Sequence, residues 1–229
     1  MPLNVFGTPD DVRPFFSANA VGFKRPKAIV FKQGDWSPGA YINNRTLPSH
    51  PTAWDDVMKP VVKYALHLIH EFDAVASVAT GGVPHGVALA RELGLPHFVV
   101  KKQEKGEHGL GGLIDGDVSL LPGMRLLLVE DMSSTFVSSI RAMRPLEHVG
   151  ATIAHTLLLN TWGFPKFYEN IGEYSVHALC TGQMLLDYAA HHRLLDYEHE
   201  AIVRRWLKHP EDRSWADDGT WELPKQASR

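Results

Sequence analysis

The stretch from Arg125 to Ser139, which reads RLLLVEDMSSTFVSS, constrains the fold more strongly than any other part of the chain. Leu126 to Val129 form a continuous apolar run, which is typical of a strand buried on both faces of a parallel sheet. The carboxylates of Glu130 and Asp131 follow where this strand is expected to end. A helix is expected over residues 137–146. Small hydroxyl residues that favour the start of a helix precede it: Ser133, Ser134 and Thr135.

This order of strand, acid pair, hydroxyl loop and helix suits the binding of a sugar phosphate. Carboxylates accept hydrogen bonds from neighbouring ribose hydroxyls, while loop amides, hydroxyl groups and the positive end of a helix dipole attract a phosphate. In an open parallel sheet such a site lies at the carboxyl ends of the strands. The stretch alone is equally compatible with an ordinary strand-to-helix turn whose acids lie in solvent, so other segments have to decide.

Strand and helix patterns alternate along most of the chain. Strands are expected at residues 28–31, 41–43, 73–79, 97–100, 126–129, 151–159 and 174–180. Helices are expected at residues 53–70, 85–93, 137–146, 167–171 and 197–207, with a further helix after Thr181. Thr181 and Asp196 are expected to cap the last two helices. The alternation predicts an α/β fold, with a mostly parallel central sheet and helices on both faces.

Composition limits the kinds of partner that the chain can have. Its 229 residues are 44% hydrophobic and 21% charged, which supplies enough apolar side chain for one globular domain with a full core. A formal net charge of −3 gives no general attraction to nucleic acid or to acidic membranes, so neither is expected as a partner. The single cysteine, Cys180, excludes an internal disulfide and is expected to be a small buried residue.

Targeting signals are not visible in the sequence. The N-terminal segment lacks the basic start and the sustained apolar core of a secretory signal. No apolar run approaches the roughly 20 residues that a membrane span needs. Together with the single cysteine, this pattern favours a protein of the reducing cytoplasm.

The stretch from Arg125 to Ser139 resembles the phosphoribosyl pyrophosphate motif of type I phosphoribosyltransferases, in which hydrophobic residues precede two acids and a loop rich in threonine and glycine. The resemblance implies that Glu130 and Asp131 hold the ribose hydroxyls. It also implies that three hydroxyl residues bind the 5′-phosphate: Ser134, Thr135 and Ser138. Where the family has glycine shortly after the hydroxyl pair, this chain has Phe136 and Val137, and neither residue adopts a positive φ at low cost.

The segment from Phe31 to Leu47, FKQGDWSPGAYINNRTL, is expected to form a hairpin-like unit. It resembles the segment that orotate phosphoribosyltransferases, one branch of this family, place over the base. The resemblance implies that Lys32 faces the pyrophosphate or the base, and that Tyr41 with Ile42 forms an apolar wall for a pyrimidine. A hairpin that merely closes the edge of the sheet, with Lys32 in solvent, is the plainer alternative.

A glycine-containing turn, formed by Thr80, Gly81 and Gly82, lies between a predicted buried strand and a predicted helix. Glycines at such a turn allow backbone amides to approach a phosphate group. In the family resemblance this loop binds the pyrophosphate leaving group. A plain turn between a strand and a helix would look similar in sequence.

A basic loop follows the strand expected at residues 97–100. The segment from Lys101 to Gly116, KKQEKGEHGLGGLIDG, places three lysines and a histidine in a glycine-rich stretch with few apolar residues. Such a loop is expected to close over a polyanion, exclude water and neutralise charge on a departing pyrophosphate. It resembles the catalytic loop of orotate phosphoribosyltransferases. The implied catalytic residues of the loop are Lys101, Lys102, Lys105 and His108.

Taken together, the order and spacing of these segments resemble orotate phosphoribosyltransferase from about Ala28 to Leu207. The resemblance implies transfer of phosphoribose from phosphoribosyl pyrophosphate to orotate, which yields orotidine 5′-phosphate and pyrophosphate in pyrimidine biosynthesis. Such an enzyme is a glycosyltransferase, and Asp131 counts among its catalytic residues beside the basic loop. The implied cofactor is Mg²⁺, held mainly by substrate oxygens with no dedicated protein ligands, and the implied assembly is a homodimer.

The same resemblance implies one phosphoribosyltransferase-like domain over residues 1–229. Residues 1–50 are expected to form a hood over the base, and residues 51–180 are expected to form the core. Residues 181–229 are expected to supply the C-terminal helices and the tail.

Two alternatives stay open from the sequence. One is a phosphoribosyltransferase for another base, because no arginine lies between Ala151 and Pro165, near the position where many orotate enzymes use one to hold the orotate carboxylate. The other is a non-catalytic regulatory or binding protein that keeps the fold. Phe136 and Val137 in the phosphate loop are the main argument for that second alternative, and the lysine-rich loop is the main argument against it.

Overall fold

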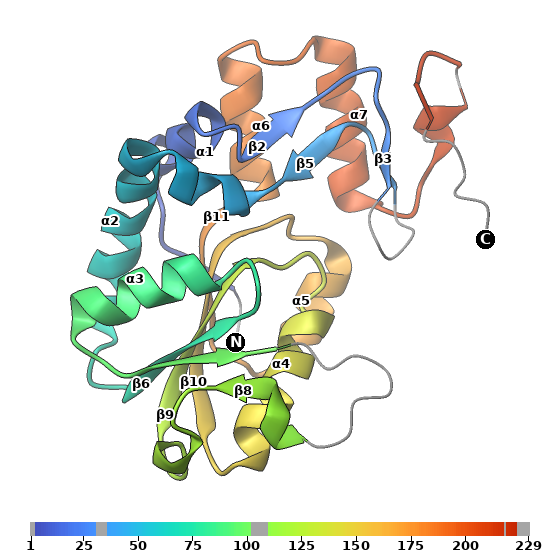
Figure 1. Cartoon of the computed structure of the whole chain (residues 1–229). Coiled ribbons are helices and arrows are strands. Elements are labelled where there is room, and N and C mark those ends of the chain that lie inside the picture. Colours follow the sequence, from blue (N-terminus) through green and yellow to red (C-terminus); the bar gives the residue numbers. More distant parts are fainter. Residues whose placement is uncertain (1–2, 31–35, 102–109, 218, 224–229) are drawn as a thin grey trace.

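The computed structural model describes residues 3–30, 36–101, 110–217 and 219–223 of the chain (Figure 1). The strands of the central sheet are β1 (Asn4–Val5), β6 (Ala74–Val78), β7 (His97–Val100), β8 (Ile114–Asp115), β9 (Arg125–Met132), β10 (Thr152–Thr161) and β11 (Val176–Thr181). Within the described ranges they form one seven-stranded sheet in the order β1–β11–β10–β9–β6–β7–β8. Neighbouring strands run parallel, except that β8 pairs antiparallel with β7 at one edge.

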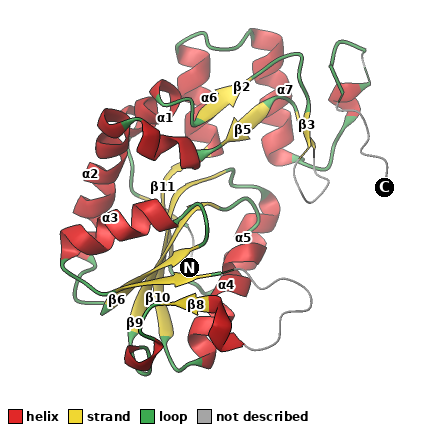
Figure 2. Cartoon of the chain, viewed as in Figure 1, coloured by secondary structure: helices red, strands yellow, loops and turns green. Residues whose placement is uncertain are grey.

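Helices cover both faces of this sheet, as Figure 2 shows. The α-helices are α1 (Arg13–Ser17), α2 (Pro51–His67), α3 (Val83–Leu93), α4 (Val137–His148), α5 (Pro165–Ile171), α6 (Gly182–His191) and α7 (Tyr197–Lys208). Alternate side chains of β9 point to opposite faces. Leu127 and Val129 pack into a core with α2 and α3, while Leu126 and Leu128 pack into a second core with α4 and α5. The predicted α/β fold with a mostly parallel sheet is thereby confirmed.

The two predicted helix caps are also confirmed. The Thr181 hydroxyl accepts a hydrogen bond from the Met184 amide at 3.4 Å, at the start of α6. The Asp196 carboxylate accepts one from the His199 amide at 2.7 Å, at the start of α7. In both cases the side-chain oxygen satisfies an amide that the first helical turn leaves without a backbone partner.

β9 is longer than predicted. The apolar run indicated a strand that ends after Val129, but β9 continues through both acids to Met132. The reason lies in the neighbouring strand, because β10 runs far enough to pair Leu158 with Glu130 and Asn160 with Met132. Pairing with a neighbour therefore outweighs the low strand propensity of the acids.

The N-terminal segment forms two antiparallel strand pairs. Strand β3 (Ile29–Val30) pairs with β4 (Trp36–Ser37), as expected of a hairpin-like unit, whereas β5 (Ala40–Ile42) pairs with β2 (Val21–Phe23), a strand not predicted from the sequence. Gly39 explains the pairing of β5 with β2. It adopts a φ of +72°, and a Cβ on it would lie 2.2 Å from the carbonyl oxygen of Lys24, so only glycine allows this close turn.

The C-terminal helices pack on this N-terminal unit. Ala40 of β5 shares a buried cluster with Trp206 of α7 and Leu186 of α6. Trp162, which lies just beyond β10, joins the same cluster and stacks edge-on against Trp206 at a ring distance of 5.1 Å. In Figure 1 these elements form the upper part of the molecule.

The first strand of the chain departs from the predicted division into hood and core. The sequence placed residues 1–50 together in the hood, but β1 pairs with β11 at the edge of the central sheet, with Asn4 opposite His177. A two-residue strand carries no periodicity of its own, so its place in the sheet becomes visible only in three dimensions.

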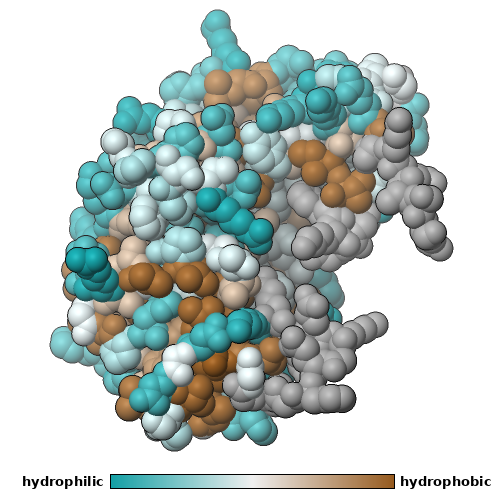
Figure 3. All heavy atoms as spheres, viewed as in Figure 1, coloured by the Kyte–Doolittle hydropathy of each residue, from teal (hydrophilic) through white to brown (hydrophobic). Residues whose placement is uncertain are grey.

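The surface is mixed in character. Figure 3 shows mostly hydrophilic residues on one face, with smaller groups of hydrophobic residues between them. Across the ranges that the structure describes, no helix combines the length and the apolar character needed to span a membrane.

Candidate active site

The loop after β6 meets the carboxyl end of the neighbouring strand β9. A Cβ built on Gly81 would lie 2.3 Å from both carboxylate oxygens of Asp131, which is far closer than any real side chain approaches. A Cβ on Gly82 would lie 2.6 Å from the carbonyl oxygen of Val129. The glycine turn predicted from the sequence is therefore seated directly against the acid pair, and both glycines are required for the close approach.

In the Thr80–Gly82 loop, at the carboxyl ends of the strands, Thr80 is exposed and both glycines are buried. The Gly82 amide donates to the carbonyl oxygen of Val78 at 3.0 Å, and α3 begins at the next residue. The peptide bond that precedes Thr80 is cis. The turn thus lies where a parallel sheet places its ligand, at the start of a helix and next to a carboxylate.

The two acids have different surroundings. Asp131 is partly exposed beside the glycine turn, whereas Glu130 is fully buried. The Ser139 hydroxyl donates a short hydrogen bond to Oε2 of Glu130. Direct contact of Glu130 with a ribose hydroxyl stays a prediction, while the position of Asp131 makes it the acid that an incoming ligand meets first.

The hydroxyl residues of the predicted phosphate loop surround the start of α4. Ser134, Thr135 and Ser138 are all partly exposed there. The carbonyl oxygen of Thr135 accepts a hydrogen bond from the Asn170 side chain at 2.7 Å, which ties the loop to α5. Hydroxyl groups at a helix start form an arrangement that attracts a phosphate.

Phe136 adopts the backbone conformation that glycine would provide. Its φ is +64°, in the left-handed region that non-glycine residues rarely enter. Its side chain is fully buried in the core under α4, at 5.7 Å from the ring of Phe167 and 5.8 Å from the ring of Tyr174. Burial of the aromatic ring offsets the backbone cost, and the ring points into the protein core.

A buried pair of asparagines connects the acid strand to the N-terminal unit. Asn44 donates to the carbonyl oxygen of Asp131 at 2.7 Å and to the side-chain oxygen of Asn160 at 3.1 Å. Both asparagines are fully buried. Tyr41 lies three residues before Asn44 and is partly exposed, with the Lys24 ammonium 4.9 Å from its ring centroid. The strand that carries Tyr41 is thereby anchored close to Asp131.

Sequence reasoning gave Asn44, Asn160 and Ser139 no role. The available signal was weak: each asparagine is a polar residue at the end of a short or apolar strand pattern. Such residues become informative only when burial requires that every amide group finds a partner. Ser139 looked like an ordinary helix residue, and only the fold places it beneath Glu130.

The basic loop is described only at its two ends. Lys101 follows β7, its ammonium lies 2.9 Å from the Asp115 carboxylate, and its amide donates to the carbonyl oxygen of Leu113 at 2.8 Å. Because β7 adjoins β6, Lys101 emerges beside the strand that leads to the glycine turn. The other predicted basic residues lie outside the described residues: Lys32, Lys102, Lys105 and His108.

A neutral histidine lies behind the glycine turn. His85, at the start of α3, is fully buried, and its Nδ1 accepts a hydrogen bond from the Trp54 indole at 3.0 Å. Burial lowers the pKa of His85 to about 4, so the imidazole carries no charge near pH 7. It therefore contributes packing and a hydrogen bond at this position, without adding positive charge.

The protein donors near Asp131 suit a magnesium ion that is bound together with a substrate. Within the described part of the chain, no group of three or more His, Cys, Asp or Glu side chains is arranged to hold a metal. Asp131 offers carboxylate oxygens, and Mg²⁺ prefers one or two carboxylates together with phosphate oxygens and water. The expectation that substrate oxygens provide most of the ligands stays a prediction.

Cys180 has no part in this chemistry. It is fully buried on β11, and burial raises the pKa of its thiol well above the ordinary value. A thiol in that state is a poor nucleophile. The predicted packing role of Cys180 is confirmed.

Comparison with known proteins agrees with this geometry. The family model described as "Phosphoribosyl transferase domain" matches residues 46–162, just over half of the chain. The chain is 32% identical over 177 residues to orotate phosphoribosyltransferase of Phocaeicola vulgatus, which covers 76% of this chain and 82% of that protein.

Solved structures share the fold. UMP synthase of Leishmania donovani superposes with a TM-score of 0.71 at 23% identity, over 87% of this chain and 42% of that longer chain. Orotate phosphoribosyltransferase of Aeropyrum pernix gives a TM-score of 0.65 at 22% identity, over 78% of this chain and 97% of that one. With the sequence matches and the glycine turn seated on the acid pair, these likenesses establish that the chain belongs to the orotate phosphoribosyltransferase family of type I phosphoribosyltransferases.

Proposed function

We propose that this protein transfers phosphoribose from phosphoribosyl pyrophosphate to orotate, and so acts as a glycosyltransferase of pyrimidine biosynthesis. The products are orotidine 5′-phosphate and pyrophosphate. The observation that carries the proposal is the close contact between Gly81 and Asp131. It brings together the glycine loop, proposed to receive the pyrophosphate, and a carboxylate for the ribose, on the sheet edge where this fold binds ligands.

The donor is held across the two loops. Asp131 accepts hydrogen bonds from the ribose hydroxyls, because it is the partly exposed acid at the end of β9. The 5′-phosphate lies at the start of α4, where the helix dipole and the loop hydroxyls attract it. The residues that contact this phosphate are Ser134, Thr135 and Ser138. The backbone of Thr80–Gly82 receives the pyrophosphate.

The base lies under the hood. Tyr41 supplies the apolar wall for a flat pyrimidine, and the hydrogen bond from Asn44 to the Asp131 carbonyl oxygen holds this wall close to the ribose site. Lys32, which lies outside the described residues, is proposed to face the pyrophosphate or the base. A wall fixed to the same strand end as the ribose acid positions the attacking nitrogen near the sugar carbon.

The bond to pyrophosphate breaks ahead of full bond formation to the base, so positive charge develops on the ribose ring. The chain contributes positioning of the ribose by Asp131 and positive charge for the leaving group from Lys101. The remaining members of the proposed catalytic loop are Lys102, Lys105 and His108. Asp131 would help to hold Mg²⁺, which, when bound, would supply positive charge that stabilises the leaving group.

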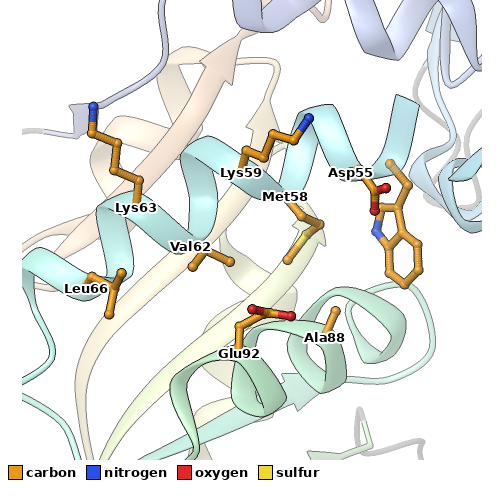
Figure 4. Close-up of a pocket in the computed structure, with 9 residues that line it drawn as sticks. Asp55, Met58, Lys59, Val62, Lys63, Leu66, Ala88 and Glu92 are labelled. Carbon is orange, nitrogen blue, oxygen red and sulfur yellow. The ribbon is translucent and has the colours of Figure 1, made fainter. Parts of the chain in front are cut away.

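We also propose that the enzyme is a homodimer, built on the groove between α2 and α3 (Figure 4). Met58 and Val62 point into this groove, and Leu66, which is 52% exposed, extends its apolar lining. Lys63 projects on the side of α2 away from Glu92 on α3. A two-fold axis through the groove would join the apolar stripes and bring these opposite charges together.

The single cysteine supports a place in the cytoplasm.

The burial of Phe136 bears on the non-catalytic alternative. The sequence left open that Phe136 blocks the phosphate loop, but its ring lies in the core with Phe167. The loop surface is left to the hydroxyl residues. This position favours a working donor site over a regulatory protein that has lost it.

An assay of base specificity tests the proposal. Protein, phosphoribosyl pyrophosphate and Mg²⁺ are mixed with orotate, and the loss of orotate absorbance is followed. Uracil and adenine in separate reactions cover the alternative bases. They are needed because no arginine lies in the sequence near the end of β10 to hold the orotate carboxylate, and Lys166, a cation that could replace it there, is paired with Glu169 at 2.8 Å. Turnover of orotate alone is expected, and Asp131→Asn is expected to reduce it strongly. Turnover of adenine or uracil with none of orotate would reassign the base.

A further inference from the structure

A chain of three buried hydrogen bonds runs beneath the phosphate loop. The Ser139 hydroxyl donates to Oε2 of Glu130. The hydroxyl oxygens of Ser133 and Ser139 lie 3.1 Å apart, and the Phe136 amide donates to the Ser133 hydroxyl oxygen at 3.1 Å. Glu130, Phe136 and Ser139 are fully buried, and Ser133 is 2% exposed. The chain therefore lies entirely inside the protein.

The proton positions in this chain follow from the number of donors. Ser139 has one hydroxyl proton, which it gives to Glu130, so none remains for Ser133. Ser133 must then donate to Ser139, and its oxygen is free to accept from the Phe136 amide. All three bonds point in one direction, from the loop backbone to the buried carboxylate. Hydrogen bonds aligned in this way, and ending on a carboxylate, strengthen one another.

The chain closes the turn that carries the phosphate ligands. Ser134 and Thr135 lie between Ser133 and Phe136, and Phe136 holds the left-handed conformation at the end of the turn. On the outer side, Asn170 donates to the Thr135 carbonyl oxygen at 2.7 Å. The turn is thus fixed from inside and outside, in a sequence that lacks the glycines on which the family relies for this loop.

We propose that Glu130 and Ser139 are positioning residues for the donor's 5′-phosphate, and that Glu130 acts on the phosphate loop through Ser139 and Ser133. This inference rests on the proposed function, because it assumes that the loop binds phosphoribosyl pyrophosphate. The buried carboxylate orients Ser139, Ser139 orients Ser133, and Ser133 holds the Phe136 amide. Ser134 and Thr135 are thereby kept in the conformation that receives the phosphate.

The test measures binding of phosphoribosyl pyrophosphate with Mg²⁺ by calorimetry, alongside the KM values of both substrates. Ser139→Ala and Ser133→Ala are each expected to weaken donor binding about ten-fold, the size expected for the loss of one buried hydrogen bond. The double variant is expected to have the same affinity for phosphoribosyl pyrophosphate as the single variant with the lower affinity, because both changes interrupt the same chain of hydrogen bonds. The KM for orotate is expected to change less than two-fold.

Thr156→Val is the matched control. Like Ser133 and Ser139, Thr156 of β10 carries a buried hydroxyl group, and the residue is 1% exposed. Its hydroxyl oxygen has no hydrogen-bond partner among the described residues. The control is expected to leave donor binding unchanged. If Ser139→Ala does not fold, Ser133→Ala alone is used for the test. It breaks the series of hydrogen bonds, while Ser139 still contacts Glu130.

Three results would overturn the inference. Donor affinity within two-fold of the wild type in Ser139→Ala would show that the chain does not position the loop. Losses that multiply in the double variant would show two independent contributions. Absence of donor binding by the wild-type protein would overturn this inference together with the proposed function. Donor binding without turnover of orotate would reject the proposed reaction alone, while the affinities would still decide the role of the chain.

Discussion

Gly81 lies so close to Asp131 that a single added methyl group would meet both carboxylate oxygens at 2.3 Å. Gly81 lies in the loop that follows β6, and Asp131 lies near the end of the neighbouring parallel strand β9. The contact fixes the distance between the backbone proposed to receive pyrophosphate and the acid proposed to hold the ribose. Substitution of the glycine should therefore act on the reaction more strongly than on the fold.

Gly81→Ala is expected to lower kcat/KM for phosphoribosyl pyrophosphate by about 100-fold, because a displacement on the order of 1 Å in a positioning residue has an effect of that size. Steady-state kinetics measure the change, and circular dichroism checks the fold. Gly94→Ala is the control, since no other atom lies within 4 Å of its added Cβ, and its φ of +67° costs stability at the end of α3, away from Asp131. Equal activity of Gly81→Ala and Gly94→Ala would contradict the placement of Asp131.

Phe136 should show an unusual order of stability among its variants. Phe136→Ala is expected to lower the free energy of unfolding by about 3–5 kcal/mol, because a large buried ring is lost. Phe136→Gly loses the same ring but relieves the left-handed backbone, so it is expected to be about 1 kcal/mol more stable than the alanine variant. Urea unfolding measures both. An alanine variant more stable than the glycine variant would contradict the backbone argument.

The buried His85 should make stability depend on pH. Its pKa is lowered to about 4 by burial, whereas an unfolded histidine takes up its proton near pH 6.5. Between these values the unfolded state binds more protons, so the free energy of unfolding is expected to fall as the pH falls from about 6.5 to about 4. His85 contributes at most about 1.4 kcal/mol per pH unit to this slope.

Urea unfolding of His85→Gln at several pH values checks this contribution. Glutamine keeps an acceptor for the Trp54 indole but does not titrate. The variant is expected to show a shallower slope between pH 4 and 6.5. A residual slope is also expected, because burial lowers the pKa of His177 to about 4 as well. A curve parallel to that of the wild type would exclude His85 as a source of the pH dependence.

The proposed dimer is tested by charge in the groove. Leu66→Glu places a carboxylate within the proposed apolar contact and is expected to convert the dimer to a monomer at micromolar concentration. Sedimentation velocity measures the change. Leu194→Glu is the control, because Leu194 is similarly exposed, at 49% against 52%, and lies between α6 and α7. A dimer that survives Leu66→Glu would place the interface elsewhere.

Much of the core could be predicted because local signals and tertiary pairing agree there. The apolar runs of β6, β9 and β10 have no place except inside a parallel sheet. Thr181 and Asp196 cap their helices because capping depends on a few adjacent residues. The meeting of the glycine turn with the acid pair also follows from topology, since carboxyl ends of parallel strands share one edge.

The remaining features depend on contacts between distant residues. The pairing of β5 with β2 is set by the close turn at Gly39, and the length of β9 is set by its neighbour β10. The burial of Glu130 needs Ser139 beneath it, and the aromatic ring of Phe136 needs Phe167 and Tyr174 around it. No local pattern specifies such partners, so sequence reasoning identified the loop but not the way it is supported.

A crystal structure with phosphoribosyl pyrophosphate and Mg²⁺ bound would show whether the glycine loop, Asp131 and the start of α4 hold the donor together. We expect a ribose hydroxyl within about 3 Å of the Asp131 carboxylate, with the 5′-phosphate at Ser134 and Thr135. The Ser139 bond to Glu130 should persist. A donor bound away from the start of α4, with Asp131 turned to solvent or the Phe136 ring moved out of the core into the loop, would rule out this site.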